Sequence, residues 1–204
     1  MSGAVWAVLP VKSFARGKSR LRPALADDER AALARRMCEH VLATTRDVHE
    51  LAGTLVITDG DDVAALAERA GAVVLRDPSS DATLAGVVDA ALASLEARGA
   101  SAALVLMADL PDILPDDLHE VLRELATHEV VVVPDHSGSF TNALALKLGC
   151  GYTSCFGSAG SAQRHLARAE SLGLRARSIR NPRIALDVDT PDAVTSAARW
   201  PRHA

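Results

Sequence analysis

The chain has 204 residues, of which 49% are hydrophobic and only 3% aromatic. This length suits one domain with one core, and the Ala-, Val- and Leu-rich composition is typical of helices packed on a parallel sheet. A net charge of −4 excludes a global positive field that would hold a nucleic acid or an acidic membrane, so any phosphate binding must be local.

The three cysteines, Cys38, Cys150 and Cys155, follow no metal-binding spacing, and their odd number argues against a disulfide framework. We therefore expect a reduced, cytoplasmic protein. The sequence shows no signal-peptide pattern, and no run approaches the ~18 apolar residues that a spanning helix needs. Neither secretion nor membrane insertion is expected.

Short apolar runs alternate with longer helical patterns along the chain. Strands are predicted at 4–11, 55–58, 72–75, 102–107, 129–133, 142–146 and 175–179. Helices are predicted at 27–48, 63–70, 84–98, 118–127, 161–172 and from residue 191 onward. Turns are expected at 77–80 and 135–139, and a short extended piece at 184–188. In the helix 27–48, Leu33, Met37, Val41 and Leu42 share one face, and Asp27 or Asp28 is the expected N-cap.

This alternation predicts one α/β domain over residues 1–204. Its sheet is expected to be Rossmann-like and mostly parallel, with helices on both faces and a small β-rich insertion after about Pro134. Ligands of such sheets bind beyond the carboxyl ends of the strands. The loop after the first strand and Asp109, which follows the strand 102–107, are therefore expected at one edge.

The loop after the first strand carries four cations, Lys12, Arg16, Lys18 and Arg20. Gly17-Lys18-Ser19 matches only the tail of a P-loop, because Lys12 stands where that motif requires a glycine. The cations are predicted to bind a nucleotide triphosphate and to neutralise charge during phosphoryl transfer, with Lys18 catalytic. The alternative is a solvated basic turn.

Three aspartates are predicted to hold Mg²⁺, which usually takes one or two protein carboxylates and completes its shell with phosphates and water. Asp109 follows an apolar strand, and Asp187 and Asp189 lie two apart in an extended segment, where side chains point the same way. Helix capping is the alternative for Asp109 and for one of the other pair. His40, His136 and His165 share no metal-binding spacing, so we expect them at the surface or the edge of the core.

Several motifs match one family in order along the chain. They are the run 10–21, Ala-Asp-Leu-Pro at 108–111, Thr-Asn-Ala-Leu at 141–144, Phe156-Gly157 with Ser161 and His165, and Ala-Leu-Asp-Val-Asp-Thr-Pro-Asp at 185–192. From residue 5 to residue 192 the chain resembles the 2-phospho-L-lactate guanylyltransferase family of coenzyme F420 biosynthesis.

This resemblance implies a nucleotidyltransferase domain related to the nucleotide-diphospho-sugar transferases. Such an enzyme uses GTP and Mg²⁺ to transfer GMP to a phosphorylated three-carbon acid, namely 2-phospho-L-lactate, phosphoenolpyruvate or 3-phospho-D-glycerate, and releases pyrophosphate. By this resemblance Asp109, Asp187 and Asp189 hold the metal, and Asp109 is also expected to be catalytic and to contact the nucleotide. Lys12, Lys18 and Arg20 hold the triphosphate, and Thr141, Gly157 and Ser161 hold the acid. Neither a nucleic acid nor a membrane is an expected partner, and a homodimer is compatible with this interpretation.

Three positions depart from the family pattern. Asp-Ala-Thr-Leu-Ala at 81–85 replaces a Gly-Leu-Asn element that contacts the guanine nucleotide, Phe140 replaces a small residue, and Gly157 and Ser161 stand one residue farther apart. We therefore expect weaker selectivity for guanine and a narrower acceptor pocket. Two alternatives stay open: a nucleotidyltransferase for another base or acceptor, and a catalytically idle nucleotide-binding protein.

Overall fold

The computed structural model describes residues 3–77 and 83–188. Their strands form one seven-stranded sheet of order β3-β2-β1-β4-β6-β5-β7. The strands are β1 (Val5–Pro10), β2 (Leu51–Thr58), β3 (Val73–Arg76), β4 (Ala102–Leu106), β5 (Val130–Pro134), β6 (Thr141–Lys147) and β7 (Ala176–Ser178). The helices are the 3₁₀ turn Ser19–Leu21, α1 (Asp27–Arg46), α2 (Asp61–Arg69), α3 (Leu84–Ala97), α4 (Pro115–Thr127) and α5 (Ser161–Ser171).

The sheet is mostly parallel, as predicted. Of the described strands, β6 alone runs against the others, and it pairs antiparallel with both β4 and β5. The β-rich segment after Pro134 therefore joins the main sheet instead of forming a separate unit. Because β6 is reversed, its first residue, Thr141, lies at the edge where the parallel strands end.

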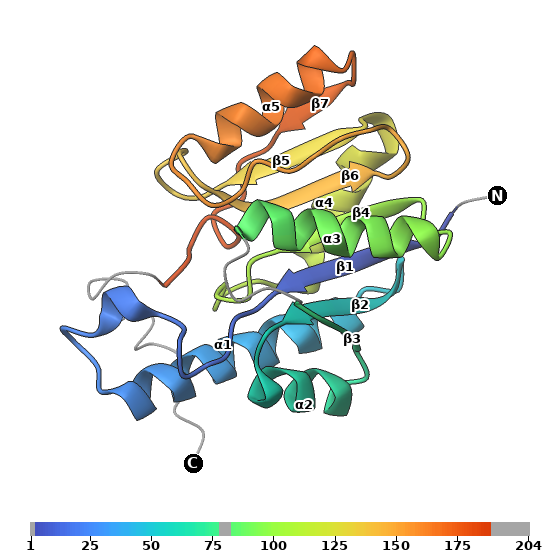
Figure 1. Cartoon of the computed structure of the whole chain (residues 1–204). Helices are drawn as coiled ribbons and strands as arrows, with labels where there is room; N and C mark the ends of the chain where they lie inside the picture. Colours follow the sequence, from blue (N-terminus) through green and yellow to red (C-terminus); the bar gives the residue numbers. More distant parts are fainter. Residues whose placement is uncertain (1–2, 78–82, 189–204) are drawn as a thin grey trace.

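Helices cover both faces of the sheet, because successive side chains of each strand point to opposite faces. In β4, Leu104 and Leu106 pack in the core under α1, α2 and α4, whereas Ala103 and Val105 pack under α3 and α5. Figure 1 shows α3 crossing in front of β1 and β4. Burial on both faces explains why the strands are continuously apolar.

Most predicted elements are present, with boundaries that shift by a few residues. The largest shift is in the second strand, since β2 begins at Leu51, four residues earlier than predicted. Helix α4 begins at Pro115, where the missing N–H of proline costs no hydrogen bond. Within 184–188 the expected extended piece is partly wrong: residues 182–185 form a turn in which the Ala185 N–H donates to Asn181 O.

The predicted N-cap of α1 is also wrong. The cap is Ala26, and Asp27 and Asp28 lie inside the first turn. The Ala26 N–H donates to Glu29 Oε2 at 2.8 Å, so a carboxylate three residues later satisfies the start of the helix. The turn predicted at 77–80 extends beyond the described residues after Asp77, and the helix predicted from 191 lies wholly outside them.

All three cysteines are free thiols, as predicted. No helix within the described part of the chain combines the length and the apolar character needed to cross a bilayer.

Candidate active site

Lys18 and Asp109 meet at the carboxyl ends of two neighbouring strands. β1 and β4 pair in parallel, so the loops that follow them leave the same edge of the sheet. Lys18 Nζ donates to Asp109 Oδ2, and the two side chains are 8% and 24% exposed. Both line a cavity of about 140 Å³, together with Pro10, Val11, Lys12, Phe14, Gly17, Ala34, Met37, Met107 and Ala108.

The backbone of Lys18 adopts an unusual conformation that the surrounding structure supports. Its φ of 53° and ψ of 39° are left-handed, and no other non-glycine residue of the described segments has a positive φ. Arg30, a buried residue of α1, donates from Nη1 to Gly17 O at 2.6 Å and so holds the preceding residue. Strained backbone of this kind clusters at functional sites, which agrees with the predicted role of the loop.

Two carboxylates hold the first half of the same loop: Asp59, which follows β2, and Asp62, in the first turn of α2. The Ser13 N–H donates to Asp59 Oδ1 at 3.0 Å, and the Phe14 N–H donates to Asp62 Oδ2 at 2.9 Å. Gly60 allows this approach, because a Cβ there would lie 2.7 Å from Ser13 Cα. The loop is therefore anchored on the end of β2 as well as on β1.

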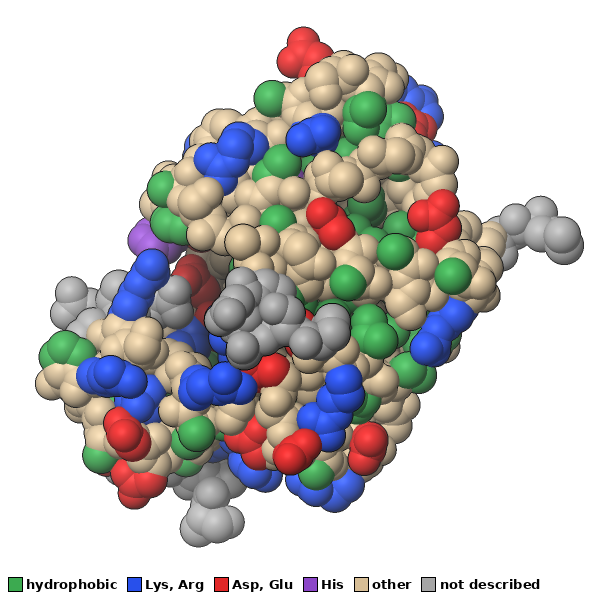
Figure 2. Space-filling view, in the orientation of Figure 1, with side chains coloured by type: hydrophobic (Ala, Val, Ile, Leu, Met, Phe, Trp, Pro, Cys, Tyr) green, Lys and Arg blue, Asp and Glu red, His purple; other side chains and the backbone are tan. Residues whose placement is uncertain are grey.

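The four predicted cations occupy different surroundings. Lys12 and Lys18 line the cavity, and the Lys12 side chain is exposed. Arg16 Nη2 lies 2.7 Å from Asp59 Oδ2, so its charge pairs with the end of β2, and Arg16 is not among the residues lining the cavity. Arg20 is exposed in the 3₁₀ turn. Figure 2 shows Lys and Arg side chains gathered over the lower left of the molecule, where this loop and α1 lie.

Asp109 has a carboxylate oxygen suited to a metal ion. Oδ1 is buried and has no hydrogen-bond partner among the described residues, although Oδ2 accepts from Lys18. A buried carboxylate oxygen without a donor is costly, and a hard divalent cation is the ligand that would satisfy it. The residue therefore fits the predicted Mg²⁺ site.

The second predicted metal ligand, Asp187, lies near Asn142, Asp135 and His136. Asn142 Nδ2 donates to Asp187 Oδ1 at 3.3 Å, and ligand atoms of Asp187, Asp135 and His136 lie within 4.8 Å of one another. Among the described residues no comparable group of three includes Asp109. The third predicted ligand, Asp189, lies outside those residues.

Asn142 connects the Asp187 cluster with the strand end that leads to Asp109. The Met107 N–H, two residues before Asp109, donates to Asn142 O at 3.0 Å. On the other side, Arg183 fixes the segment that carries Asp187, because its Nη2 donates to the buried Asp117 Oδ1 at 2.7 Å. Burial by itself would raise the pKa of Asp117, but hydrogen bonds from Arg183 and Asn181 leave it below its usual range.

Two of the three predicted acid-binding residues lie together, Thr141 at the start of β6 and Ser161 at the start of α5. Thr141 Oγ1 lies 3.1 Å from Ser161 Oγ, and the two residues are only 3% and 1% exposed. Gly157 has a φ of 103°, which favours glycine, and a Cβ there would lie 3.7 Å from Leu84 Cβ. Gly157 therefore borders the 81–85 segment that departs from the family pattern.

His165 joins this group and lies in the core instead of at the surface or the core edge. It is 0% exposed, its Nδ1 lies 3.1 Å from Thr141 Oγ1, and its Nε2 accepts the Cys155 N–H at 2.7 Å. Burial lowers its pKa to about 4, with a smaller contribution from Arg164. Ser161 and His165 are four residues apart and so share one helix face, which is the sequence signal that the two side chains lie near each other.

The other departures from the family pattern have local structural roles. Thr83 is the N-cap of α3, and its Oγ1 accepts the Gly86 N–H at 3.2 Å. The Phe140 N–H donates to Asp135 Oδ1 at 2.8 Å, and the Phe140 side chain is 37% exposed. Asp81 and Ala82 lie outside the described residues.

A larger cavity of about 420 Å³ lies beside α5 and the ends of β5 and β7. Its polar lining includes His136, Gln163 and Arg180. Asp135 also lines this cavity, but both of its carboxylate oxygens already accept hydrogen bonds from residues 137–140. The cavity lined by Lys18 and Asp109 is smaller, but Asp109 is the residue that has the unpaired carboxylate oxygen, which makes this cavity the better candidate for chemistry.

Comparison with known proteins identifies the family of the chain. The family described as "Guanylyl transferase CofC like" matches residues 5–196. The phosphoenolpyruvate guanylyltransferase of Sphaerobacter thermophilus is 35% identical over 188 residues, covering 91% of this chain and 88% of that protein. The 3-phospho-D-glycerate guanylyltransferase of Phenylobacterium zucineum is 32% identical over 200 residues, covering 96% and 90%.

Solved structures show the same fold at low identity. A Desulfovibrio desulfuricans protein, named provisionally as a nucleotide-diphospho-sugar transferase, superposes with a TM-score of 0.77 at 16% identity, covering 98% of this chain and 88% of its own. Rv0371C of Mycobacterium tuberculosis, in complex with manganese, gives 0.60 at 15% identity, covering 98% and 100%. Together with the extent of the sequence matches, this shows that the chain is a nucleotidyltransferase and belongs to the CofC guanylyltransferase family.

Proposed function

We propose that this protein transfers GMP from GTP to a phosphorylated three-carbon acid and releases pyrophosphate, as a step of coenzyme F420 biosynthesis. The observation that carries the proposal is the pairing of Lys18 with Asp109 at the ends of β1 and β4, where Asp109 keeps one buried oxygen without a partner. This arrangement offers a cation for a triphosphate and a carboxylate for a metal in one cavity.

The reaction is an in-line displacement at the α-phosphorus of GTP. An oxygen of the acid's phosphate forms the new P–O bond while the bond from the α-phosphorus to the pyrophosphate oxygen breaks. A phosphate is already ionised near neutral pH, so positioning and charge neutralisation carry most of the catalysis. Lys18 and Lys12 would neutralise the triphosphate, Lys18 directly at the reacting group.

Mg²⁺ is the proposed metal, with Asp109 as its ligand in the cavity and Asp187 and Asp189 as the further proposed ligands. When bound there, the metal would supply positive charge that offsets the negative charge of the reacting phosphates. The manganese in the Rv0371C structure supports a divalent cation on this fold.

Thr141, Ser161 and Gly157 are the proposed acceptor site. Phosphoenolpyruvate and 3-phospho-D-glycerate are the acceptors to test first, because they give two of the relatives their names. Phe140 immediately precedes Thr141 and is partly exposed, which supports a restricted pocket. Phe140→Gly should then change the ratio of kcat/KM values between acceptors, and an unchanged ratio would place Phe140 outside the pocket.

A second candidate function differs only in the base. Thr83 uses its hydroxyl to cap α3, so that oxygen is committed to the Gly86 N–H and is a poor reader of a guanine edge. A base is rejected strongly only when buried polar groups match the edge of the correct one. We therefore expect GTP to be preferred over ATP by less than a fully matched guanine site would allow.

A nucleotide-by-acceptor panel tests the proposal. GTP, ATP and CTP are each combined with 2-phospho-L-lactate, phosphoenolpyruvate and 3-phospho-D-glycerate, and pyrophosphate release is measured. We expect the highest kcat/KM with GTP and one of the three acids. No release with any pair would favour the catalytically idle alternative, and a preference for ATP or CTP would favour another base.

Asp109→Asn is the matched test of the site within that panel. It keeps the shape of the side chain and removes the charge, so we expect turnover to fall at least 100-fold at limiting Mg²⁺. Asp112→Asn removes an exposed carboxylate three residues away and should leave turnover unchanged. Equal activity of the two variants would exclude Asp109 from the metal site.

A further inference from the structure

The ring of His165 is held by a hydrogen bond at each nitrogen. Nε2 lies 2.7 Å from the Cys155 backbone nitrogen, which can only donate, so Nε2 must be the unprotonated acceptor. A neutral imidazole then carries its hydrogen on Nδ1, which points at Thr141 Oγ1 at 3.1 Å. Burial favours the neutral form, because it holds the pKa at about 4. The network therefore assigns one tautomer, in which His165 donates to Thr141.

This direction decides how many hydrogens the two hydroxyls can offer to a ligand. Thr141 and Ser161 each carry one hydroxyl hydrogen, and the bond between their oxygens at 3.1 Å uses one of them. Because His165 donates, the second hydrogen remains. In the opposite tautomer Thr141 would donate to Nδ1 and Ser161 to Thr141, and neither hydrogen would remain for a ligand.

From this count we propose that His165 is a positioning residue of the acceptor site, which keeps the Thr141–Ser161 pair a hydrogen-bond donor for an anionic oxygen of the phosphorylated acid. The inference rests on the proposed function, in which Thr141 and Ser161 bind that acid. Carboxylates and phosphates accept hydrogen bonds and do not donate them when ionised, so they require a donor at this place.

The surroundings of His165 keep the ring in this orientation. Phe156 packs its ring edge-on at a centroid distance of 4.7 Å, and Tyr152 Oη donates to His165 O at 3.1 Å. The Cys155 N–H on Nε2 also ties the chain just before Gly157 to α5. The His165 side chain thus orients the Thr141–Ser161 hydroxyl pair and also holds the segment just before Gly157.

Two amide substitutions separate the two bonds. In His165→Gln the side-chain amide reaches the position of Nε2 and can still accept from Cys155, while in His165→Asn it reaches the position of Nδ1 and can still donate to Thr141. Without Nδ1–H, nothing fixes the orientation of the Thr141 hydroxyl, so the spare hydrogen of the pair is no longer held toward the ligand. This loss of orientation should raise the KM for the acceptor by roughly tenfold. We expect that rise in His165→Gln, a smaller one in His165→Asn, and a KM for GTP within about twofold of the wild type in both. His49→Gln, at a side chain 85% exposed, is the matched control and should change neither value.

A double-mutant cycle tests whether His165 acts through Thr141. In a Thr141→Val background, His165→Gln should raise the acceptor KM no further, because the hydroxyl that it orients is gone. Additive effects would overturn the inference, as would an unchanged acceptor KM in His165→Gln.

The wild-type protein provides a test that does not depend on folding of the variants. Long-range ¹H–¹⁵N spectra should show the His165 ring protonated at Nδ1 and unprotonated at Nε2 between pH 6 and 8. A hydrogen on Nε2 would overturn the inference. Absence of wild-type turnover with every acceptor would instead overturn the proposed function.

Discussion

At the scale of single residues, the two oxygens of Asp109 have different surroundings. Lys18 donates to Oδ2, and Oδ1 is buried without a partner among the described residues. If Asp109 binds the proposed metal, Lys18 would compete with that ion for the carboxylate in the absence of nucleotide. A triphosphate would draw the ammonium away, so metal and nucleotide should each strengthen the binding of the other by the same factor.

Lys18→Met tests this competition through metal binding alone. Removing the cation should raise the affinity for Mn²⁺ in the absence of nucleotide by about tenfold, and GTP should no longer increase it. The measurement is a titration of free Mn²⁺ by electron paramagnetic resonance. Lys12→Met removes the same charge from the same cavity and should have a smaller effect, because Lys12 is exposed. Equal effects would attribute the change to net charge and not to the ion pair.

At the scale of elements, α2 holds the loop after β1 by carboxylates and by a close approach at Gly60. A Cβ at Gly60 would lie 2.7 Å from Ser13 Cα and 2.4 Å from Asp62 Oδ1. Gly60→Ala should therefore push the loop away and break the bond from the Phe14 N–H to Asp62. We expect amide hydrogen exchange at Phe14 to speed up at least tenfold while the rest of the sheet exchanges normally.

Gly17→Ala is the control for that prediction. It lies in the same loop, but its Cβ would meet no atom closer than 3.7 Å. Exchange at Phe14 should stay at the wild-type rate in this variant. Equal acceleration in both would show that the loop tolerates no side chain at all, and unchanged exchange in Gly60→Ala would show that α2 does not hold it.

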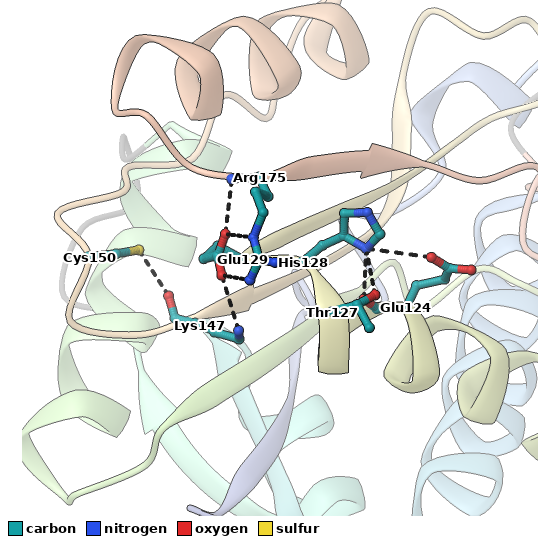
Figure 3. A network of polar contacts seen from close by, with 7 residues as sticks. All are labelled: Glu124, Thr127, His128, Glu129, Lys147, Cys150 and Arg175. Atoms are coloured by element: carbon teal, nitrogen blue, oxygen red, sulfur yellow. Dashed lines mark hydrogen bonds and ion pairs between the residues drawn. The ribbon is translucent and has the colours of Figure 1, made fainter.

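Glu129, directly before β5, links the start of β5 to the residue before β7 through hydrogen bonds with Arg175 (Figure 3). Its carboxylate accepts from the Arg175 N–H at 2.9 Å, from Arg175 Nη2 at 2.8 Å and from Lys147 Nζ at 3.2 Å. These bonds, led by those from Arg175, lower the pKa of Glu129 to about 2. The Glu129 side chain is partly exposed, so solvent screens part of this stabilisation.

Glu129→Gln should destabilise the protein only where the wild-type carboxylate is ionised. A lowered pKa in the folded state means that the stabilisation is complete above the unfolded value of 4.5 and is lost as the pH falls toward 2. We expect a Tm a few degrees below the wild type at pH 7 and no difference near pH 2, measured by differential scanning calorimetry. A difference that persists at pH 2 would mean that packing, not charge, accounts for it.

At the scale of the whole molecule, the buried His165 links folding to pH in the neutral to acid range. Its pKa falls from 6.5 to about 4 on folding, so the unfolded chain binds a proton there that the folded protein does not. Stability should be complete above pH 6.5 and fall as the pH drops toward 4, by on the order of 3 kcal/mol in total.

Urea unfolding at pH 7 and pH 4.5 measures this linkage. His165→Gln has no titrating ring, so its loss of stability between the two pH values should be smaller than that of the wild type. His49→Gln removes an exposed histidine and should lose as much as the wild type. Equal losses in all three proteins would show that other groups cause the acid sensitivity.

Local pattern in the sequence determined the layout of the molecule. Apolar strands alternating with amphipathic helices predicted a mostly parallel sheet, because such strands must be covered on both faces. The same rule placed Lys18 and Asp109 at one edge, since both follow the carboxyl ends of parallel strands. The motifs then indicated the family, which the comparisons confirm.

Tertiary packing decided the contacts between residues far apart in the chain. The reversed strand β6 brings Thr141 and Asn142 to the edge of the sheet where Lys18 and Asp109 lie. Arg16 pairs with Asp59, and Asp187 accepts a hydrogen bond from Asn142. The His165 ring lies within hydrogen-bond distance of Thr141. Local periodicity carries no information on these partners, because each depends on which side chains the packed sheet, helices and turns bring within hydrogen-bond distance. The direction of the His165 bond depends further on the Cys155 N–H, which reaches the ring only in the folded protein.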